Sequence, residues 1–467
     1  MSILAELEPL FYPRGVAIIG ASQDPRKFGH LCVRSLLNSE FEGPVYPINP
    51  SVSHLVGLKT YPSLGAAPGL IDLCIIVLSP DRVLSALEEC GNRGIKGAII
   101  ITAGFRESGA ETGSRLQREM TRIADRFGIK IIGPNTFGMV NLHAGLNASF
   151  TPLFSSLKKG PVAFISQSGG MCHNFSYMAM DDGLGISKIM SLGNRCNLEF
   201  SDMIRYLGED PQTEVIAMYV EGVEDGRALL SVAREVARKK PLIAYKGARS
   251  QASGTAAFSH TGSLAGNYPL YQSAFRQARV ITVTDSTSLF DGAKALSLCP
   301  RPSGNRIAIC SIIAGPAIVA SDASEGEGLV LPRFSPETQE RLDRVLSPLF
   351  MNTNPVDLTS AQSMEIWSEV FHAVFSDGNT DLLLVILPKQ EFYDPMIGGI
   401  VDLLIELSSV YRKPLSVCAT SPVNMFAGYK ARLQDNRIPV YPTPERAARA
   451  MGYLVRYALW QSDNSSV

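Results

Sequence analysis

One histidine, His260, lies in a loop of small and polar residues that suits chemistry on an exposed imidazole. The loop reads Phe258-Ser259-His260-Thr261-Gly262-Ser263-Leu264-Ala265-Gly266. A neutral imidazole can accept a phosphoryl group, and it needs an acceptor on its other ring nitrogen to fix the tautomer and stabilise positive charge. Glu221, in Tyr219-Val220-Glu221-Gly222, supplies a carboxylate at the end of a predicted strand. These residues predict a nucleophilic histidine oriented by a glutamate; a structural histidine is the alternative.

A second candidate site follows a predicted strand that ends at 166. The chain there reads Ile165-Ser166-Gln167-Ser168-Gly169-Gly170 and opens a predicted helix. Small residues and free backbone N–H groups at a helix N-terminus bind anions, because the helix dipole favours negative charge. The predicted phosphate-binding residues are Ser166, Ser168, Gly169 and Gly170. His173 has two open interpretations, which are contact with an acyl group and a solvated position on the helix.

The first strand and turn, Val16-Ala-Ile-Ile-Gly20-Ala21-Ser22-Gln23, bring backbone N–H groups close together. Such a turn can approach a phosphate. The dinucleotide fingerprint G-x-G-x-x-G is absent, and the next strand ends Pro47-Ile48-Asn49-Pro50 without the acid that would hold a nicotinamide ribose. These absences disfavour an NAD-dependent dehydrogenase. A structural turn without a ligand is the alternative that the turn alone leaves open.

Parallel α/β sheets must position these sites, since such sheets bind ligands at the carboxyl ends of their strands. Short runs rich in Val and Ile alternate with longer amphipathic stretches, which is the α/β pattern. The predicted strands are 16–19, 45–48, 73–78, 98–102, 130–132, 162–166, 186–191, 215–221, 242–246, 306–313, 382–388 and 414–419. The predicted helices include 29–38, 81–93, 111–127 and 444–461.

The length and two connectors predict three domains. The chain has 467 residues, and the prior is about one domain per 150 residues. A connector at 151–161 contains Pro and Lys, and Cys299-Pro300-Arg301-Pro302-Ser303-Gly304 has the composition of an interdomain link. The predicted domains are a Rossmann-like domain over 1–150 and two flavodoxin-like, doubly wound domains over 151–302 and 303–467.

Composition excludes several classes of protein. Lys and Arg total 43 against 44 for Asp and Glu, and this net charge of -1 disfavours a nucleic-acid binder. The N-terminus lacks a signal-peptide pattern, and the longest strongly apolar stretch, 382–387, is too short to span a bilayer. The eight cysteines contain no C-x-x-C pair, and most lie in apolar runs. We expect a cytoplasmic protein, in a reducing compartment, with no metal site and no membrane or nucleic-acid partner.

Several of these segments resemble one enzyme family. V-A-I-I-G-A-S, Y-P-I-N-P, I-I-T-A-G-F-R-E and G-P-N-T-F-G resemble the CoA-binding domain of NDP-forming acyl-CoA synthetases. S-H-T-G-S-L-A-G resembles the phosphohistidine loop of ADP-forming acetyl-CoA synthetase (acetate–CoA ligase) α subunits, and Y-V-E-G resembles their histidine-orienting glutamate. S-L-G-N-R at 191–195 also resembles this family, and the succinyl-CoA synthetase α subunit is a more distant relative. The motifs are specific in combination because they follow the expected order through two domains.

The resemblance implies a CoA site in the first domain and a reaction at the histidine. The residues implied to bind CoA are Gly20, Ala21, Ser22, Gln23, Lys27, Asn49, Pro50, Ile101, Thr102, Ala103 and Asn135, with Lys27 as a candidate contact to a CoA phosphate. In the implied reaction, ATP phosphorylates His260 while Glu221 orients the ring, and the phosphoryl group passes to a carboxylate to give an acyl phosphate. The CoA thiolate would then attack the acyl phosphate, which forms acyl-CoA and releases phosphate. Acetate, branched-chain, aryl and hydroxy acids all remain open as the acid.

The sequence differs from the family pattern in the third domain and contains no motif for a nucleotide site. Ile312–Ala317 takes the place of the family's N-A-G-G-P-G and is poorer in glycine, whereas Asn354–Thr359 matches N-P-V-D-L-T. No domain resembles the ATP-grasp fold that charges the histidine in this family, and no G-x-x-x-x-G-K-[ST] loop replaces it. We therefore expect an α-type subunit of a hetero-oligomer, whose ATP-grasp β-type partner mainly binds ATP or ADP and Mg. A CoA or acyl-CoA sensor without turnover is the alternative, which the pair of His260 and Glu221 disfavours.

Overall fold

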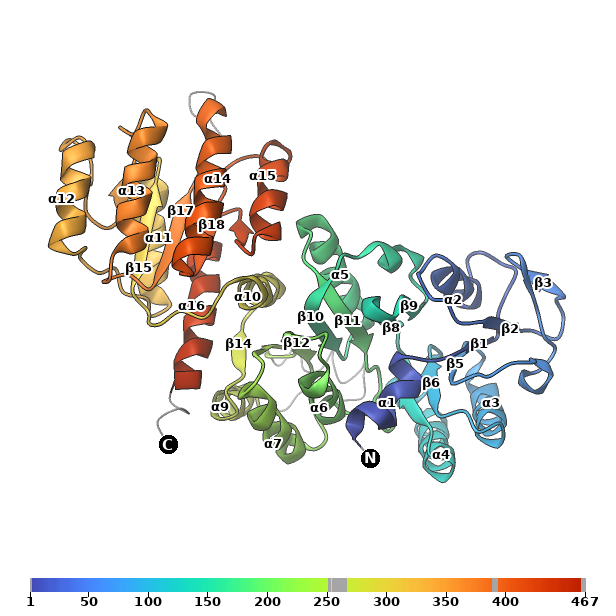
Figure 1. The fold of residues 1–467 in the computed structure, drawn as a ribbon. Helices are drawn as coiled ribbons and strands as arrows, with labels where there is room; N and C mark the ends of the chain where they lie inside the picture. Colours follow the sequence, from blue (N-terminus) through green and yellow to red (C-terminus); the bar gives the residue numbers. More distant parts are fainter. Residues whose placement is uncertain (1, 251–252, 254–266, 389–393, 463–467) are drawn as a thin grey trace. The chain divides into compact units, whose positions relative to one another are not determined.

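The computed structural model describes residues 2–250, 253, 267–388 and 394–462 (Figure 1). The chain divides into two compact units, 1–286 and 287–467. Unit 1 contains two large sheets and a two-stranded one, and unit 2 contains one large sheet. The strands of the large sheets run mostly parallel and helices connect them, so the predicted α/β class is confirmed.

The first sheet is parallel and buries the apolar side chains of its strands on both faces, as parallel sheets do. Its order is β2 (Val45–Ile48), β1 (Val16–Ile19), β5 (Leu73–Ile76), β6 (Gly97–Ile100) and β7 (Lys130–Ile132). Val16 and Ile18 share a core with α1 (Ile3–Phe11) and α2 (Phe28–Leu37). Ala17 and Ile19 share another core with α3 (Pro80–Asn92) and α4 (Glu111–Phe127).

The second sheet combines five parallel strands with an antiparallel pair that the sequence analysis missed. Its order is β14 (Ile281–Val283), β13 (Leu242–Lys246), β12 (Val215–Val220), β10 (Lys159–Ser166), β11 (Ile186–Ser191), β8 (Gly138–Asn141) and β9 (Leu146–Ser149), with helices α5 (Gly169–Asp182), α6 (Phe200–Glu209), α7 (Gly226–Ala237) and α9 (Tyr268–Gln277). β8 runs antiparallel to β11, and β9 runs antiparallel to β8. Residues 138–149 therefore complete the second sheet, although they precede the connector at 151–161.

The short elements of unit 1 are β3 (His54–Leu55), β4 (Leu58–Lys59), η1 (Leu64–Ala66), η2 (Arg106–Ser108), η3 (Leu142–Ala144) and η4 (Pro152–Ser156).

Unit 2 is built on the third sheet and begins near the start of α10. The sheet order is β16 (Val356–Asp357), β15 (Ile307–Ser311), β17 (Leu382–Ile386), β18 (Leu415–Cys418) and β19 (Val440–Tyr441). The helices are α10 (Ser286–Leu298), α11 (Ala314–Gly326), α12 (Pro336–Val345), α13 (Met364–Ser376), α14 (Asp394–Tyr411), α15 (Val423–Asp435) and α16 (Pro444–Ser462). Buried Lys294 of α10 donates to the Val440 carbonyl at 2.7 Å. This contact ties α10 to the third sheet, although α10 precedes the connector at 299–304.

The five parallel strands of each of the three large sheets share one order. Numbered along the chain, with β8 and β9 of the second sheet left aside, the order is 2-1-3-4-5, which is flavodoxin-like. The winding direction reverses between the first and third strands, and ligands bind outside the carboxyl ends of the strands at that point. In unit 1 these points lie between β1 and β5 and between β10 and β12.

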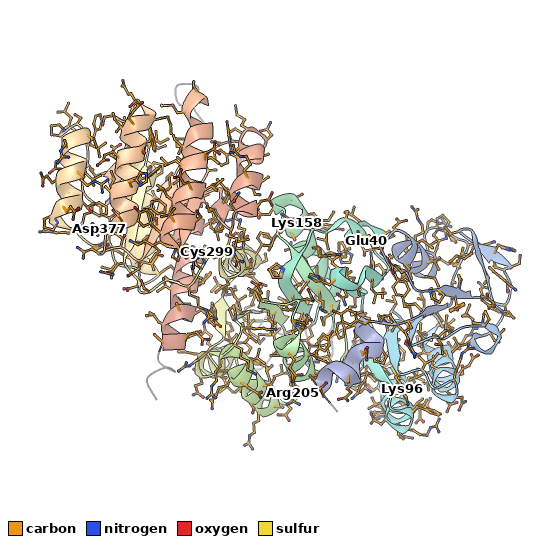
Figure 2. The ribbon with its side chains drawn as sticks, viewed as in Figure 1. Glu40, Lys96, Lys158, Arg205, Cys299 and Asp377 are labelled. Carbon is orange, nitrogen blue, oxygen red and sulfur yellow. The ribbon has the colours of Figure 1, made fainter. Side chains whose placement is uncertain are left out.

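The cysteines pack as small apolar side chains. All eight are free, and seven, including Cys299, labelled in Figure 2, are buried. Burial raises the pKa of the remaining thiol, Cys196, to about 11. Within the described ranges, no helix is long and apolar enough to cross a membrane, and no group of three or more His, Cys, Asp or Glu could hold a metal ion.

Candidate active site

A groove of about 650 Å³ opens at the carboxyl ends of β1, β2 and β5. Its lining includes six residues predicted to bind CoA, which are Gly20, Ala21, Ser22, Lys27, Asn49 and Pro50. Gly20 has a φ of +96°, and a Cβ there would lie 2.1 Å from the Val77 carbonyl oxygen. Asn49 donates to the Ala21 carbonyl at 2.7 Å and accepts from the Ser51 N–H at 2.8 Å. These contacts fix the loops that form the groove.

Two exposed cations line this groove, Lys27 and Arg82. Arg82 lies in the first turn of α3 and was missed in the sequence analysis. The available signal was the sequence Leu78-Ser79-Pro80 after the third apolar strand, which repeats the strand-to-helix pattern of the first. Lys and Arg side chains both bind phosphate oxygens, so this pair suits the phosphates of CoA.

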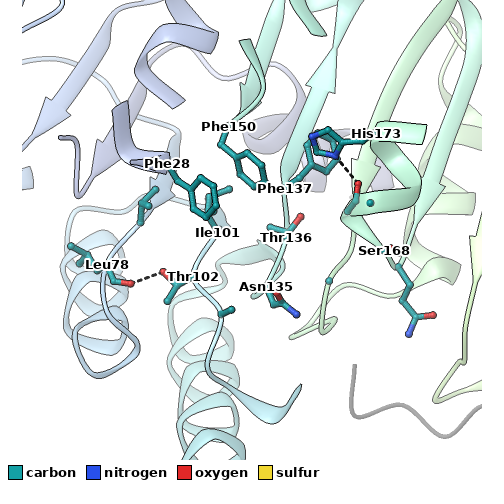
Figure 3. Close-up of a pocket in the computed structure, with 16 residues that line it drawn as sticks. Phe28, Leu78, Ile101, Thr102, Asn135, Thr136, Phe137, Phe150, Ser168 and His173 are labelled. Atoms are coloured by element: carbon teal, nitrogen blue, oxygen red, sulfur yellow. Dashed lines mark hydrogen bonds between the residues drawn. The ribbon is translucent and has the colours of Figure 1, made fainter. Parts of the chain in front are cut away.

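A second cavity of about 610 Å³ adjoins the groove, because Val77 and Leu78 line both (Figure 3). Its lining includes the other predicted residues Ile101, Thr102, Ala103, Asn135, Ser168, Gly169 and Gly170. Thr102 Oγ1 donates to the Leu78 carbonyl at 2.8 Å, and the Asn135 N–H donates to the Thr102 carbonyl at 2.9 Å. The structure thus brings residues predicted for CoA and residues predicted for phosphate to one cavity.

Of the residues predicted to bind CoA or phosphate, Gln23 and Ser166 line neither of these two cavities. Gln23 donates to the His54 carbonyl at 3.3 Å and ties the turn after β1 to β3. The buried Ser166 hydroxyl accepts from the Ser168 N–H at 3.0 Å and donates to the Ser168 carbonyl at 2.7 Å. Ser166 therefore shapes the turn, while Ser168 caps α5 by accepting from the Met171 N–H at 3.4 Å.

Glu221 lies directly after β12, and Gln167 holds its backbone. The side-chain oxygen of Gln167 accepts from the N–H groups of Glu221 and Gly222 at 2.9 and 3.0 Å. Burial raises the pKa of the Tyr219 hydroxyl, and the nearby Glu221 carboxylate, to which it hydrogen bonds, raises it further. Gln167 was missed in the sequence analysis, although its place between two predicted phosphate-binding serines was the available signal.

Lys246, the last residue of β13, also holds the Glu221 backbone. Its Nζ donates to the carbonyls of Glu221 and Gly247 at 2.7 and 2.6 Å, and it lies 4.8 Å from the centre of the Tyr271 ring. Burial lowers the pKa of Lys246 to about 8, and Glu221 partly opposes that shift. The chain after β13 leads to His260, which lies outside the described residues.

The S-L-G-N-R segment connects this site to the first sheet. Gly193 lines the second cavity, and buried Arg195 donates to the Gly222 carbonyl and pairs with Glu199 at 3.3 Å. Asn194 Nδ2 donates to Gln117 Oε1 of α4 at 3.1 Å. This segment therefore braces the loop that follows Glu221.

Unit 2 repeats the turn after β10 without its polar cap. Ser311 accepts from the Ile313 N–H at 3.2 Å and donates to the Ile313 carbonyl at 2.6 Å, as Ser166 does with Ser168. The residue before α11 is Ile313, and its side chain makes no cap hydrogen bond. Asn354 of the N-P-V-D-L-T segment accepts from the Ile309 N–H at 3.0 Å and so bonds to β15. The turn thus keeps its backbone shape and loses the hydroxyl that suits an anion site.

Comparison with known proteins matches two family models to the chain, one over the first sheet and one over the second sheet and most of α10. Residues 14–141 match the CoA binding domain, and residues 159–296 match the succinyl-CoA ligase like flavodoxin domain. The class defined by fold and site is therefore that of CoA-binding acid–thiol ligases.

Full-length relatives define the family. Acetate--CoA ligase [ADP-forming] II subunit alpha of Pyrococcus furiosus is 38% identical over 97% of this chain and 98% of its own length. Acetate--CoA ligase [ADP-forming] I of Archaeoglobus fulgidus is 39% identical over 97% of this chain, which covers 64% of that longer protein. A solved structure of the Ca. Korarchaeum cryptofilum dinucleotide forming acetyl-coenzyme A synthetase 1, in complex with phosphate and ADP, matches with a TM-score of 0.89 and 34% identity over 98% of each chain. The chain belongs to the α subunits of the ADP-forming acyl-CoA synthetases, as the resemblance predicted.

Proposed function

We propose that this chain forms acyl-CoA from a carboxylic acid, CoA and ATP, through a phosphohistidine at His260 and an acyl phosphate. The observation that carries this proposal is the Gln167 bridge, which holds the Glu221 loop beside the start of α5. The start of α5 lines the same cavity as four of the residues predicted to bind CoA. A carboxylate, an anion-binding turn and a CoA groove are the parts that the reaction requires.

Each part has a proposed role. The groove with Lys27 and Arg82 binds the CoA phosphates, and the pantetheine arm passes Val77 and Leu78 into the second cavity. The N–H groups at the start of α5 hold phosphoryl oxygens and stabilise the charge that develops on them. Glu221 orients the His260 ring, which passes its phosphoryl group to the carboxylate of the acid. The CoA thiolate then attacks the acyl carbon, and phosphate leaves.

The nucleotide step needs a further domain. We propose that a separate ATP-grasp subunit of β type binds ATP or ADP with Mg and phosphorylates His260. The relation of lengths supports this, because the chain covers 98% of the Pyrococcus furiosus α subunit and 64% of the longer Archaeoglobus fulgidus protein. The free, mostly buried cysteines agree with a cytoplasmic enzyme.

Reconstitution with an ATP-grasp partner chain tests the function. The complex should convert CoA, ATP and an acid from a broad panel into a thioester, and release phosphate in equal amount. Glu221→Gln should slow this reaction while leaving the dissociation constant for CoA unchanged, because Glu221 does not line the groove. A complex that binds CoA and ATP but forms no thioester with any acid would overturn the proposal and support the sensor.

A further inference from the structure

Arg106 lies where two loops of unit 1 meet, one from the first sheet and one from the second. The first loop follows β6, and its residues 101–103 line the second cavity before the chain enters η2 (Figure 3). The second loop follows β12 and contains Glu221 and Glu224. A guanidinium N–H group of Arg106 donates to the Glu224 carboxylate at 2.5 Å. This ion pair therefore connects a loop that lines the cavity with the loop predicted to orient His260.

The backbone around Arg106 is held in a fixed turn. Gly104 has a φ of +105°, and the Oε1 atom of Glu107 accepts its N–H at 2.6 Å and that of Phe105 at 3.2 Å. The side chain of Phe105 is fully buried. The N–H of Arg106 itself donates to Gln117 of α4 at 3.4 Å. The side chain of Arg106 thus starts from a defined position, so the ion pair does not depend on ordering the backbone first.

A second arginine reaches the same carboxylate from the S-L-G-N-R segment. Nη2 of the buried Arg195 lies 3.8 Å from the Glu224 carboxylate, and its Nη1 donates to the Gly222 carbonyl. Arg106 joins this arrangement through its other terminal nitrogen, which donates to the Asn194 carbonyl. Glu224 therefore lies between two cations, one from a loop of each sheet.

These contacts hold the far end of a loop whose near end is already fixed. Gln167 and Lys246 hold the backbone of Glu221 itself. The contacts of Glu224 hold the same loop three residues further on, just before α7 begins at Gly226. A loop held at both ends keeps the Glu221 carboxylate in one place. This matters for the reaction, because a displacement of about 1 Å in a reacting group can slow a reaction about a hundredfold.

Partial exposure separates this role from a role in folding. The side chains of Arg106 and Glu224 are 26% and 58% exposed, and ion pairs at such positions contribute little to the stability of a folded chain. Neither residue is among those found to line the groove or the second cavity. The pair is therefore suited to positioning the loop rather than to binding CoA or stabilising unit 1.

We propose that Arg106 and Glu224 are a positioning pair, which holds Glu221 at a fixed place relative to the loop that lines the CoA cavity. This inference rests on the proposed function, since it requires Glu221 to orient His260 during phosphorylation. It gives the two acidic residues of Y-V-E-G-V-E different tasks, because Glu221 orients the histidine and Glu224 holds the loop.

Rapid-quench phosphorylation of His260, with ATP and the ATP-grasp partner chain, tests the inference. Arg106→Gln and Glu224→Ala should each lower the rate of phosphorylation about tenfold, with the dissociation constant for CoA, measured by titration calorimetry, within about twofold of wild type. The double variant should lose much less than the product of the two single losses, because each change alone already breaks the pair. Arg126→Gln, at the exposed pair with Glu88, is the matched control and should change neither value.

The outcomes separate this inference from the proposed function. Unchanged rates in both single variants, a double variant that loses the full product, or CoA binding weakened as much as phosphorylation would each overturn the positioning role. Urea unfolding shows whether each variant is folded, and Glu224→Ala, at the more exposed side chain, keeps the test decisive if Arg106→Gln destabilises the chain. If wild type itself is not phosphorylated, the proposed function fails. An active wild type beside equally active variants overturns this inference alone.

Discussion

The side chain of Gln167 accepts the backbone N–H of Glu221 at 2.9 Å, across the point where the winding of the second sheet reverses. Gln167 is 3% exposed and directly precedes Ser168, the cap of α5. One side chain thus links the turn predicted to bind phosphate with the loop predicted to orient the histidine. This hydrogen bond fixes the position of the Glu221 loop relative to the start of α5. It joins two segments that were predicted separately from their own sequence motifs.

Replacing this bridge should impair phosphorylation more than CoA binding. Gln167→Met keeps the length of the side chain but leaves two buried N–H groups without their acceptor, at a cost of about 1–3 kcal/mol each. We expect the rate of phosphorylation of His260 to fall about tenfold or more, with the dissociation constant for CoA within twofold of wild type. Rapid-quench phosphorylation measures the rate, and Gln434→Met in unit 2, also at a buried glutamine, is the control. An unchanged rate would show that the bridge is dispensable.

The buried Lys246 predicts an alkaline limit on activity. Its pKa of about 8, lowered by burial, means that the ammonium loses its charge as the pH rises through this value. The bonds to the carbonyls of Glu221 and Gly247 then lose their charge assistance. Phosphorylation should therefore decline above about pH 8, and Lys246→Met should be slower at pH 7 and lack this decline. A decline of the same size in Lys246→Met would assign it to another group.

This decline is distinct from unfolding. Because the pKa of Lys246 is lower in the folded chain than in the unfolded chain, the unfolded chain binds more protons between these two values. The contribution of Lys246 to the free energy of unfolding therefore increases as the pH rises from about 8 toward the pKa of the unfolded chain. Circular dichroism at each pH should show a folded protein where activity has already fallen.

The groove cations predict a salt-dependent affinity for CoA. Lys27→Ala and Arg82→Ala should each raise the dissociation constant about threefold to tenfold, since each removes one contact to phosphate. Both losses should shrink at high salt. Titration calorimetry measures them, and Lys59→Ala, in β4 and outside the groove, is the control. An unchanged affinity for CoA in both variants would show that the CoA phosphates do not bind in this groove.

A buried ion pair braces the second sheet and predicts a large loss of stability. Lys188 of β11 donates to Asp210 at 2.6 Å, and the two side chains are 0% and 2% exposed. Asp210→Asn leaves the Lys188 charge buried without its partner, which should cost about 3–5 kcal/mol. Urea unfolding measures the loss, and Glu88→Gln, at an exposed pair with Arg126, should cost less than about 1 kcal/mol. Equal losses in the two variants would contradict this account.

The pH dependence of this pair has a definite sign. Burial raises the pKa of Asp210, but the hydrogen bonds from Lys188 and Thr213 outweigh burial and leave that pKa below its ordinary value. The stabilisation is therefore complete above the pKa of the unfolded carboxyl group and is lost as the pH falls through the folded pKa. In Asp210→Asn, the free energy of unfolding should therefore fall less steeply with decreasing pH at acidic pH than it does in wild type.

Helices with a clear local pattern of apolar and polar residues were predicted well from the sequence. The predicted helix 111–127 matches α4, and the helices predicted at 29–38, 81–93 and 444–461 lie within a residue of α2, α3 and α16 at either end. β8 and β9 were missed because Gly138–Asn141 and Leu146–Ser149 are short, and because the pairing of β8 with β11, which brings both strands into the second sheet, depends on tertiary contacts. Such long-range pairing carries no local period in the sequence.

Site residues that belong to a motif at the end of a strand were predicted from the sequence. Side chains that connect two such strand ends were missed. Gly20, Asn49 and Ser168 follow strands and were found. Gln167 and Lys246 act through backbone groups of Glu221, and their partners become visible only when β10, β12 and β13 lie side by side. The lining of the second cavity likewise combines residues of α2, α5 and the ends of β8 and β9, which are distant in the sequence.

Intact-protein mass spectrometry at alkaline pH tests the phosphohistidine most directly. The full chain is incubated with phosphate and each acyl-CoA of a broad panel that includes acetyl-CoA, beside His260→Ala as the matched control. We predict that wild type gains the mass of one phosphoryl group, that the fragment containing His260 carries it, and that His260→Ala gains nothing while binding CoA normally. A wild-type chain that binds CoA but stays unmodified, or a His260→Ala variant that is phosphorylated equally, would contradict the central claim.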